Sequence, residues 1–327
     1  LEDILGQCHV DEVDALVIAG DLFDKDYVDP SDFERVCRAH PAITVHIIPG
    51  NHDASLSAQK LVGDRLIVHD ETTVLDFEGR RFLFLPYRPN STMADEIGSF
   101  ADQIEGQDWV LVAHGDYTGG PREPNPLEMG TYMPLTRACL DRCRPQTVFL
   151  GHIHKPANHG KVWIPGSPCP LDVSETGRRR FLIYDTADGS VQEQTVTTDT
   201  IYFWETFLVL PCEDEVTRLR HEIAERIAGW EISPAEREIV QVRVEAAGYA
   251  MDRAAILEAL TDGFGGFHFA KDEAPKVDRL QHSPDRQLLA VATRAREVVD
   301  ALSWQFGGDE PTREQVMLEA MKTVYQV

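Results

Sequence analysis

The chain has 327 residues, which is enough for two or three domains with substantial hydrophobic cores. A hydrophobic content of 43% indicates a globular protein, and we expect no membrane span because no apolar run reaches roughly 18 residues. We see no signal peptide, and six scattered cysteines without a Cys-x-x-Cys pair fit a reducing cytoplasm, where we expect the protein. The net charge of −24 argues against a protein that holds nucleic acid by itself, because an acidic surface repels phosphates.

The first two predicted strands each end in a polar loop. Residues 1–13 are predicted to be the end of a helix, and the strand 15–19 that follows runs into Gly20-Asp21-Leu22-Phe23-Asp24. The β-branched run at 43–48 is predicted to be the next strand, and it breaks into Gly50-Asn51-His52-Asp53. Because Asn offers a carbonyl oxygen, His a titratable nitrogen and Asp a carboxylate, this pattern is typical of a strand that delivers a functional loop.

Two later strands have the same form. The apolar run 109–113 leads into His114-Gly115-Asp116, and the run 147–150 leads into Gly151-His152-Ile153-His154. Such apolar runs are predicted to be strands that are buried on both faces. Because the loops at the ends of such strands meet at one edge of an open sheet, we expect these polar side chains to lie together.

Shorter elements are predicted between and after these strands. They are helices at 32–40, 94–104 and 134–142, and strands at 66–68, 73–75, 81–85, 162–164, 178–184 and 191–196. His46 and His69 are interpreted as ordinary strand residues. The basic run Arg178-Arg179-Arg180 is interpreted as a solvated hairpin, with contact to a phosphate backbone as the alternative.

The composition changes near residue 198, where we place the end of a first domain, 1–198. A small α+β domain is predicted at 199–274, with strands at 202–210, 238–246 and 264–269 and helices at 214–228 and 252–260. Residues 275–283 are interpreted as a polar linker. The remainder of 275–327 is predicted to form two amphipathic helices, one with an apolar stripe from Leu288 to Leu302 and one that begins at Pro311.

The polar residues at the strand ends are metal-ligand types. Asp21 can bridge two cations through its two oxygens, and the other members supply one donor each: Asn51, His114, His152 and His154. A mixture of imidazole with carboxylate or amide suits Mn, Fe or Zn, and two cations roughly 3.5–4 Å apart are the usual device for phosphoester cleavage. Taken singly, Asp21 has an alternative interpretation as a turn residue and each His as a structural residue. The joint pattern favours a metal site.

These motifs resemble those of the calcineurin-like metallophosphoesterases, and more narrowly those of the SbcD-type nuclease subunits of DNA-repair complexes. The narrow resemblance rests on Gly20–Asp24, on Gly151-His152-Ile153-His154-Lys155-Pro156 and on Pro165-Gly166-Ser167-Pro168. It implies an α/β fold, a four-layer β-sandwich flanked by helices, with a small α+β capping domain and C-terminal helices. It also implies two divalent metal ions, Mn²⁺ by preference, a homodimer, DNA as substrate and an SbcC-like SMC-family ATPase as partner.

The resemblance also implies a role for each residue. Asp21 bridges the metals, Asn51, His114 and His152 complete one of them, and His154 joins the other. As catalytic residues, His52 donates a proton to the leaving oxygen or stabilises developing charge, and Asp53 orients His52. The family also places an Asp-x-His motif on a strand before the first helix. Nothing in residues 1–9 matches this motif, so we expect these two ligands upstream of Leu1.

Three functions remain open at this point. The first is a manganese-dependent exonuclease or endonuclease that acts on DNA beneath an SMC-like ATPase. The second is a phosphodiesterase or phosphatase that acts on small molecules or phosphoproteins, which the net acidity favours. The third is a non-catalytic subunit that only braces an ATPase. The two C-terminal helices likewise have two interpretations, as a segment that binds the ATPase or as helices packed on their own domain.

Overall fold

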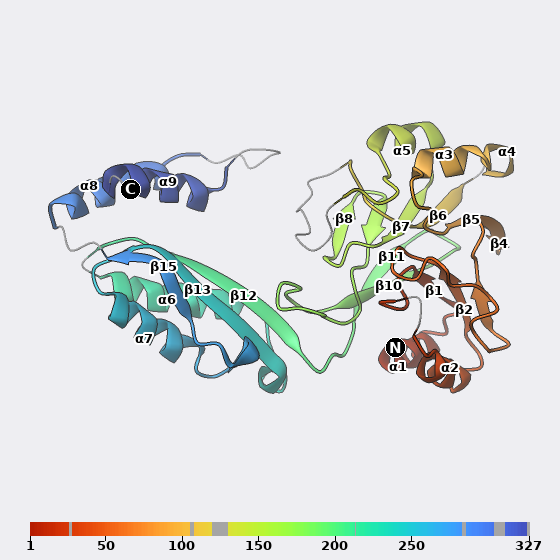
Figure 1. The fold of residues 1–327 in the computed structure, drawn as a ribbon, viewed down its shortest axis with the longest axis horizontal. Helices are drawn as coiled ribbons and strands as arrows, with labels where there is room; N and C mark the ends of the chain where they lie inside the picture. Colours follow the sequence, from red (N-terminus) through yellow and green to blue (C-terminus); the bar gives the residue numbers. More distant parts are fainter. Residues whose placement is uncertain are drawn as a thin grey trace. The chain divides into compact units, whose positions relative to one another are not determined.

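Figure 1 shows a computed structural model of the chain, which describes residues 1–25, 28–104, 108–119, 130–212, 214–282, 286–303 and 311–325. The chain divides into two compact units. The first unit consists of Leu1–Cys169 and Arg179–Thr197, and the second of Pro170–Arg178 and Thr198–Val327.

The first unit contains three sheets and five helices in its described part. Its first half runs α1 (Glu2–Val10), β1 (Ala15–Ala19), α2 (Ser31–Arg38), β2 (Thr44–Ile48), β3 (Leu66–Val68), β4 (Thr73–Phe77), β5 (Arg80–Leu85), α3 (Met93–Gly98) and α4 (Ala101–Ile104). Its second half runs β6 (Trp109–His114), α5 (Arg137–Cys143), β7 (Thr147–Gly151), β8 (Ala157–His159), β9 (Val162–Ile164), β10 (Arg180–Tyr184) and β11 (Val191–Thr195).

Two of these sheets pack face to face. One is the parallel sheet β1-β2-β3, and the other has six strands in the order β4-β5-β6-β7-β9-β8, in which β5, β6, β7 and β9 are parallel neighbours. The apolar cluster between them joins Ile48 of β2 with Phe84 of β5 and Val112 of β6. β10 and β11 form a third, two-stranded antiparallel sheet.

Helices cover the outer faces of the two large sheets. Ile4 and Leu5 of α1 and Val36 of α2 share an apolar cluster with Ile43, just before β2. Ile97 of α3 and Leu140 of α5 belong to the cluster on the outer face of the six-stranded sheet. The layers are therefore helix, sheet, sheet, helix, and the predicted α/β fold class is confirmed.

The four long apolar strands β1, β2, β6 and β7 form where they were predicted, within one residue at each end. Every residue of β6 is buried, which is why its sequence is an unbroken apolar run. β6 and β7 are parallel neighbours, as are β1 and β2, so the carboxyl ends of each pair lie at the same edge.

The second unit is built on one sheet with helices on both faces. Its elements are β12 (Ile201–Val209), α6 (Glu215–Gly229), β13 (Val240–Ala250), α7 (Arg253–Phe264), β14 (His268–Phe269), β15 (Lys276–His282), α8 (Arg286–Asp300) and α9 (Arg313–Tyr325), with two short 3-10 turns at Glu236–Ile239 and Ala270–Asp272. β13 is central, and β12, β14 and β15 all pair with it in parallel. Helices α6 and α7 lie on one face of the sheet, and α8 and α9 lie side by side on the other (Figure 1).

Three predictions for individual elements were wrong. The segment 275–283 is not a linker, because Lys276–His282 forms β15. The single helix predicted at 94–104 is broken into α3 and α4 after Gly98, a residue that weakens a helix. The strand predicted at 264–269 is limited to β14, because α7 continues to Phe264. Within the described residues, no helix is both long and apolar enough to cross a membrane.

Candidate metal centre

Glycines allow the strand ends of the first unit to approach one another closely. A Cβ atom on Gly50 would fall 2.1 Å from Oδ1 of Asp21, and one on Gly151 would fall 1.8 Å from the carbonyl oxygen of Ala19. These distances exclude any side chain at the two positions. The Gly that precedes the polar residues of each loop therefore lets the loops after β1, β2 and β7 pack against each other.

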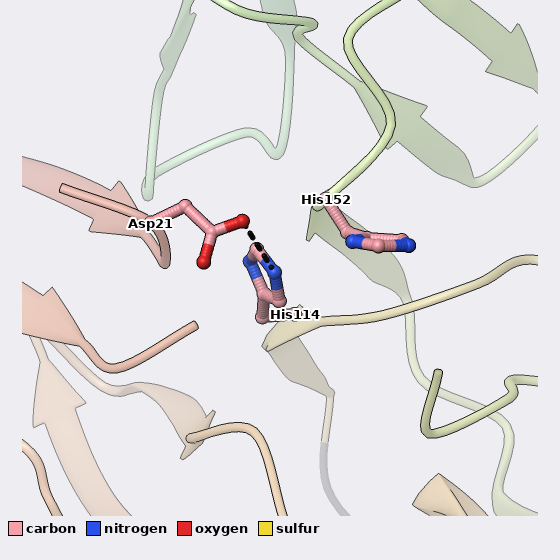
Figure 2. Close-up of side chains that lie close together, drawn as sticks. All are labelled: Asp21, His114 and His152. Atoms are coloured by element: carbon pink, nitrogen blue, oxygen red, sulfur yellow. Dashed lines mark ion pairs between the residues drawn. The ribbon is translucent and has the colours of Figure 1, made fainter. Parts of the chain in front are cut away.

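Three side chains from three strand ends converge at this edge. Figure 2 shows the carboxylate of Asp21, after β1, facing the imidazole of His114 at the end of β6, with His152 after β7 beside it. The ligand atoms of these three residues all lie within 4.8 Å of one another. Nε2 of His114 is 3.1 Å from Oδ2 of Asp21. His114 is fully buried, and the other two residues are half-buried.

Asn51 places a fourth donor at the centre of this group. Its Oδ1 lies 2.8 Å from Nε2 of His114 and 2.9 Å from Nδ1 of His152. The four residues Asp21, Asn51, His114 and His152, here called the metal cluster, therefore direct an amide oxygen, a carboxylate and two imidazoles at one point.

The hydrogen bonds of His114 show why this cluster fits a cation. Nδ1 of His114 lies 2.8 Å from the carbonyl oxygen of Ala19, which can only accept a hydrogen bond, so this nitrogen carries the proton. In the neutral imidazole, Nε2 then presents a lone pair to the oxygens of Asp21 and Asn51. Three acceptors without a donor repel one another, and a divalent cation of the first-row type would satisfy all three.

Two members of the metal cluster have unusual backbone angles. Asp21 has φ +52° and His152 has φ +89°, in the left-handed region that favours glycine. Such conformations cost of the order of 1–3 kcal/mol and persist where the surroundings enforce them, as they do at functional sites. Burial raises the pKa of Asp21, but the neighbouring imidazole of His114 and the hydrogen bond from the amide of His52 outweigh it, so the pKa is lowered and the carboxylate stays charged.

The structure changes the role expected of Asp53. Asp53 is buried, and its two oxygens accept hydrogen bonds from the backbone amides of Gly50, at 2.7 Å, and Phe23, at 3.2 Å. The imidazole of His52 instead lies beside Asp24, with Nδ1 3.2 Å from its carbonyl oxygen and 3.6 Å from its carboxylate. The prediction that Asp53 orients His52 is therefore wrong: Asp53 ties two loops together through their amides, although burial raises its pKa.

His154 is positioned through its backbone. Its carbonyl oxygen accepts hydrogen bonds from the Arg179 guanidinium and from the amide of Ser167, the latter at 3.2 Å. The side chain of His154 does not belong to the group of ligand atoms found among the described residues, so its role in a second metal stays a prediction.

Two residues beside the metal cluster, Asp116 and Tyr132, and the buried Arg179 were not assigned to the site from the sequence. Asp116 is buried with Oδ1 3.9 Å from Nε2 of His152, and the Tyr132 ring lies 5.0 Å from that of His152. Arg179 is also buried, and it donates to Ser167 as well as to His154. The position of Asp116, two residues after His114, could have identified it from the sequence. Nothing in the run of three arginines indicated that Arg179 would be the buried one.

About half of the chain matches the model of a known protein family. Residues 1–156 match the model of the calcineurin-like phosphoesterase family, and the match includes every member of the metal cluster. The match supports the interpretation of the chain as a metallophosphoesterase. Such an enzyme is a hydrolase that acts on phosphoesters with the divalent metals that this family uses.

Proposed function

We propose that the chain is a metal-dependent DNA nuclease built on the calcineurin-like phosphoesterase domain that residues 1–156 match. The observation that carries the proposal is the convergence of Asp21, Asn51, His114 and His152 at the edge of two packed sheets. This donor set would hold a divalent metal, for which we propose Mn²⁺. His154 would contribute a donor to the second ion.

The residues around the metal cluster have distinct tasks in this proposal. Bound metal supplies the activation of water and the neutralisation of charge on the phosphoryl oxygens. His52 has 36% of its side chain exposed and faces solvent beside the cluster, where it can donate a proton to the leaving sugar oxygen. Asp24 holds the imidazole of His52, and Asp53 fixes the two loops that carry Asp21 and Asn51.

Two observations support DNA as the substrate. The motifs Gly151–Pro156 and Pro165–Pro168 resemble those of SbcD-type nucleases, and the second unit follows the phosphoesterase domain as a capping domain does in that group. A net charge of −24 opposes tight binding of DNA by the chain alone. A partner must therefore supply part of the positive surface.

The C-terminal helices are the segment through which we propose that an SMC-like ATPase binds. One side of α8 packs on the second unit through Ala292 and Val299. On α8 and just beyond its end, Val291 is 52% exposed, Val298 49% and Leu302 50%, and they follow one another at helical spacing. The two interpretations of these helices are thus compatible, because one side packs on its own unit while the other presents an apolar stripe. We propose a homodimer on the resemblance alone.

The alternative function is a phosphodiesterase that acts on small molecules. The observation that favours it is the acidic charge, since a small substrate needs no extended basic surface.

Cleavage of a labelled linear DNA duplex with Mn²⁺ tests the proposal. The protein is assayed with and without an SMC-like ATPase and ATP, next to His52→Ala and the control His9→Ala, an exposed residue of α1. We expect His52→Ala to abolish cleavage while metal content stays at the wild-type level, and His9→Ala to cleave normally. Turnover of a small phosphodiester without DNA cleavage would favour the alternative, and turnover of neither would favour a bracing subunit.

A further inference from the structure

We infer that Asp116 is a positioning residue whose carboxylate selects the tautomer of His152 that can bind metal. The inference rests on the proposed metal site and deepens it. Asp116 is only 2% exposed and comes two residues after β6. Its Oδ1 lies 3.9 Å from Nε2 of His152, while its Oδ2 accepts a hydrogen bond from the Tyr132 amide at 2.7 Å.

The two nitrogens of His152 face different partners. Nδ1 is 2.9 Å from Oδ1 of Asn51, on the side of the metal cluster, and Nε2 faces Asp116. A neutral imidazole carries one proton and only the other nitrogen can bind a metal. Because a carboxylate can only accept, Asp116 favours the proton on Nε2 and leaves the lone pair of Nδ1 for the cation.

The ring of His114 is also oriented by an acceptor at the nitrogen that faces away from the cluster, but this acceptor is a backbone carbonyl. The carbonyl oxygen of Ala19 holds its proton on Nδ1, so its Nε2 faces the cluster. Each imidazole of the cluster thus has an acceptor behind it, a backbone carbonyl for His114 and a carboxylate for His152.

The backbone around Asp116 fixes its carboxylate in place. The amide of Asp116 donates to the carbonyl oxygen of Tyr132 at 2.8 Å, and its own carbonyl oxygen accepts from the amide of Leu135 at 2.8 Å. The His152 ring contacts the rings of Tyr132 and His114, with centroids 5.0 and 5.2 Å away. The contact at 3.9 Å is longer than a hydrogen bond, and we expect it to tighten into one when the site is filled, as contacts of this kind often do.

Asp116→Asn separates the two tasks of this side chain. The amide oxygen can still accept from Tyr132, but the NH₂ group then donates to Nε2 of His152 and favours a proton on Nδ1, which blocks the ligand. We expect the affinity for Mn²⁺, measured by titration calorimetry, to fall about 10–100-fold. We also expect the unfolding midpoint of the metal-free protein to stay within about 2 °C of wild type, because the variant is isosteric and keeps the hydrogen bond to Tyr132.

The control is Asp141→Asn, an exposed carboxylate on α5, which should bind Mn²⁺ like wild type. Asp116→Asn with unchanged Mn²⁺ affinity would overturn the inference and leave the proposed function standing. A loss of affinity that comes with a large fall in the unfolding midpoint would also overturn it, since Asp116 would then be merely structural. A wild-type protein that binds no Mn²⁺ would overturn the proposed metal site itself, and the inference with it.

Discussion

The imidazole of His114 is the most buried part of the metal cluster, and its surroundings determine what its removal should do. Its Nε2 faces two oxygens and its Nδ1 a carbonyl, so His114→Ala removes a ligand and also relieves the crowding of acceptors. We therefore expect the variant to lose metal binding without a comparable loss of stability in the metal-free state.

Thermal unfolding with and without Mn²⁺ measures this. A ligand at 100 times its Kd stabilises a protein by about 2.7 kcal/mol, so the wild-type midpoint should rise on adding Mn²⁺ and fall back with a chelator. In His114→Ala the rise should disappear, while His9→Ala should keep it. A Mn²⁺-dependent rise of wild-type size in His114→Ala would contradict the assignment of this ligand.

Gly151 gives a second test, since it makes the closest approach in the cluster region. The added methyl group of Gly151→Ala would overlap the carbonyl oxygen of Ala19, whose backbone cannot move without shifting β1. We expect a loss of unfolding free energy of at least about 2 kcal/mol in urea and a weaker Mn²⁺ affinity. Gly6→Ala on α1, where the methyl group meets no atom within 4 Å, should be neutral or stabilising. Equal stabilities of the two variants would refute the argument.

At this scale the sequence predicts which side chains converge in the metal cluster better than it predicts their supporting contacts. Asp21, Asn51, His114 and His152 could be grouped because each lies at the end of an apolar strand or within three residues of it, and parallel neighbours end at one edge. The partners of Asp53 could not, because they are backbone amides that any residue type can supply. The role of Asp116 could not be predicted because its partner, the amide of Tyr132, lies 16 residues later in the sequence.

Among the elements, β2 and β3 bring two histidines together in the core. His46 on β2 and His69 just after β3 are both buried, with Nδ1 of one 3.0 Å from Nε2 of the other and His69 stacked on Phe84. The sequence indicated ordinary strand residues, and the structure adds that the two side chains form a buried pair in contact with each other. Burial lowers the pKa of both, and that of His69 falls to about 4.

This pair predicts a pH dependence of stability. A histidine whose pKa is lowered by folding stabilises the native state fully above its ordinary pKa of about 6.5, and the contribution is lost as the pH falls towards 4. For His69 alone the expected loss between pH 7 and pH 5 is of the order of 2 kcal/mol, because the unfolded chain takes up the proton first. Urea unfolding at both pH values measures it. His69→Phe should weaken this dependence, and an unaltered pH dependence in the variant would contradict the assignment.

The elements also show where patterns mislead. Strands buried on both faces are unbroken apolar runs and were predicted within one residue, whereas β15 buries Val277 and Leu280 and has polar residues at its other positions. The basic run after residue 177 is likewise not a solvated hairpin: Arg178 binds Glu236, Arg179 is buried and Arg180 pairs with Glu193 across β10 and β11.

Helices α8 and α9 allow the effect of core packing on stability to be measured separately from binding of the proposed ATPase partner. Met321 of α9 is fully buried, so Met321→Ala should cost about 2–5 kcal/mol of unfolding free energy. Val298→Ala on the exposed side of α8 should change stability by no more than about 0.5 kcal/mol, and under the proposed function it should weaken binding of the ATPase. Denaturant unfolding and a pull-down with the ATPase measure the two effects. If neither variant binds the ATPase more weakly than wild type, the support for the proposed interface is lost.

For the molecule as a whole, the course of the chain between the two units is a feature that composition does not reveal. The chain passes from one unit to the other between residues 169 and 170, again between 178 and 179, and finally between 197 and 198. Composition changes only near the last of these points. Residues 170–178 thus belong to the second unit although they lie within the sequence of the first, and Arg178 shows how they are fastened there.

The guanidinium of Arg178 donates to both carboxylate oxygens of Glu236, at 3.0 and 2.9 Å, and also to the carbonyl oxygens of Trp230 and Glu231. Glu236→Gln removes the charge of the main partner, so we expect hydrogen–deuterium exchange in 170–178 to become several-fold faster. The affinity for Mn²⁺ should not change, because every member of the metal cluster lies in the first unit. Glu225→Gln, an exposed residue of α6, should leave exchange in 170–178 unaltered. Faster exchange together with a lost Mn²⁺ site would mean that this segment, despite belonging to the second unit, is needed to build the metal cluster.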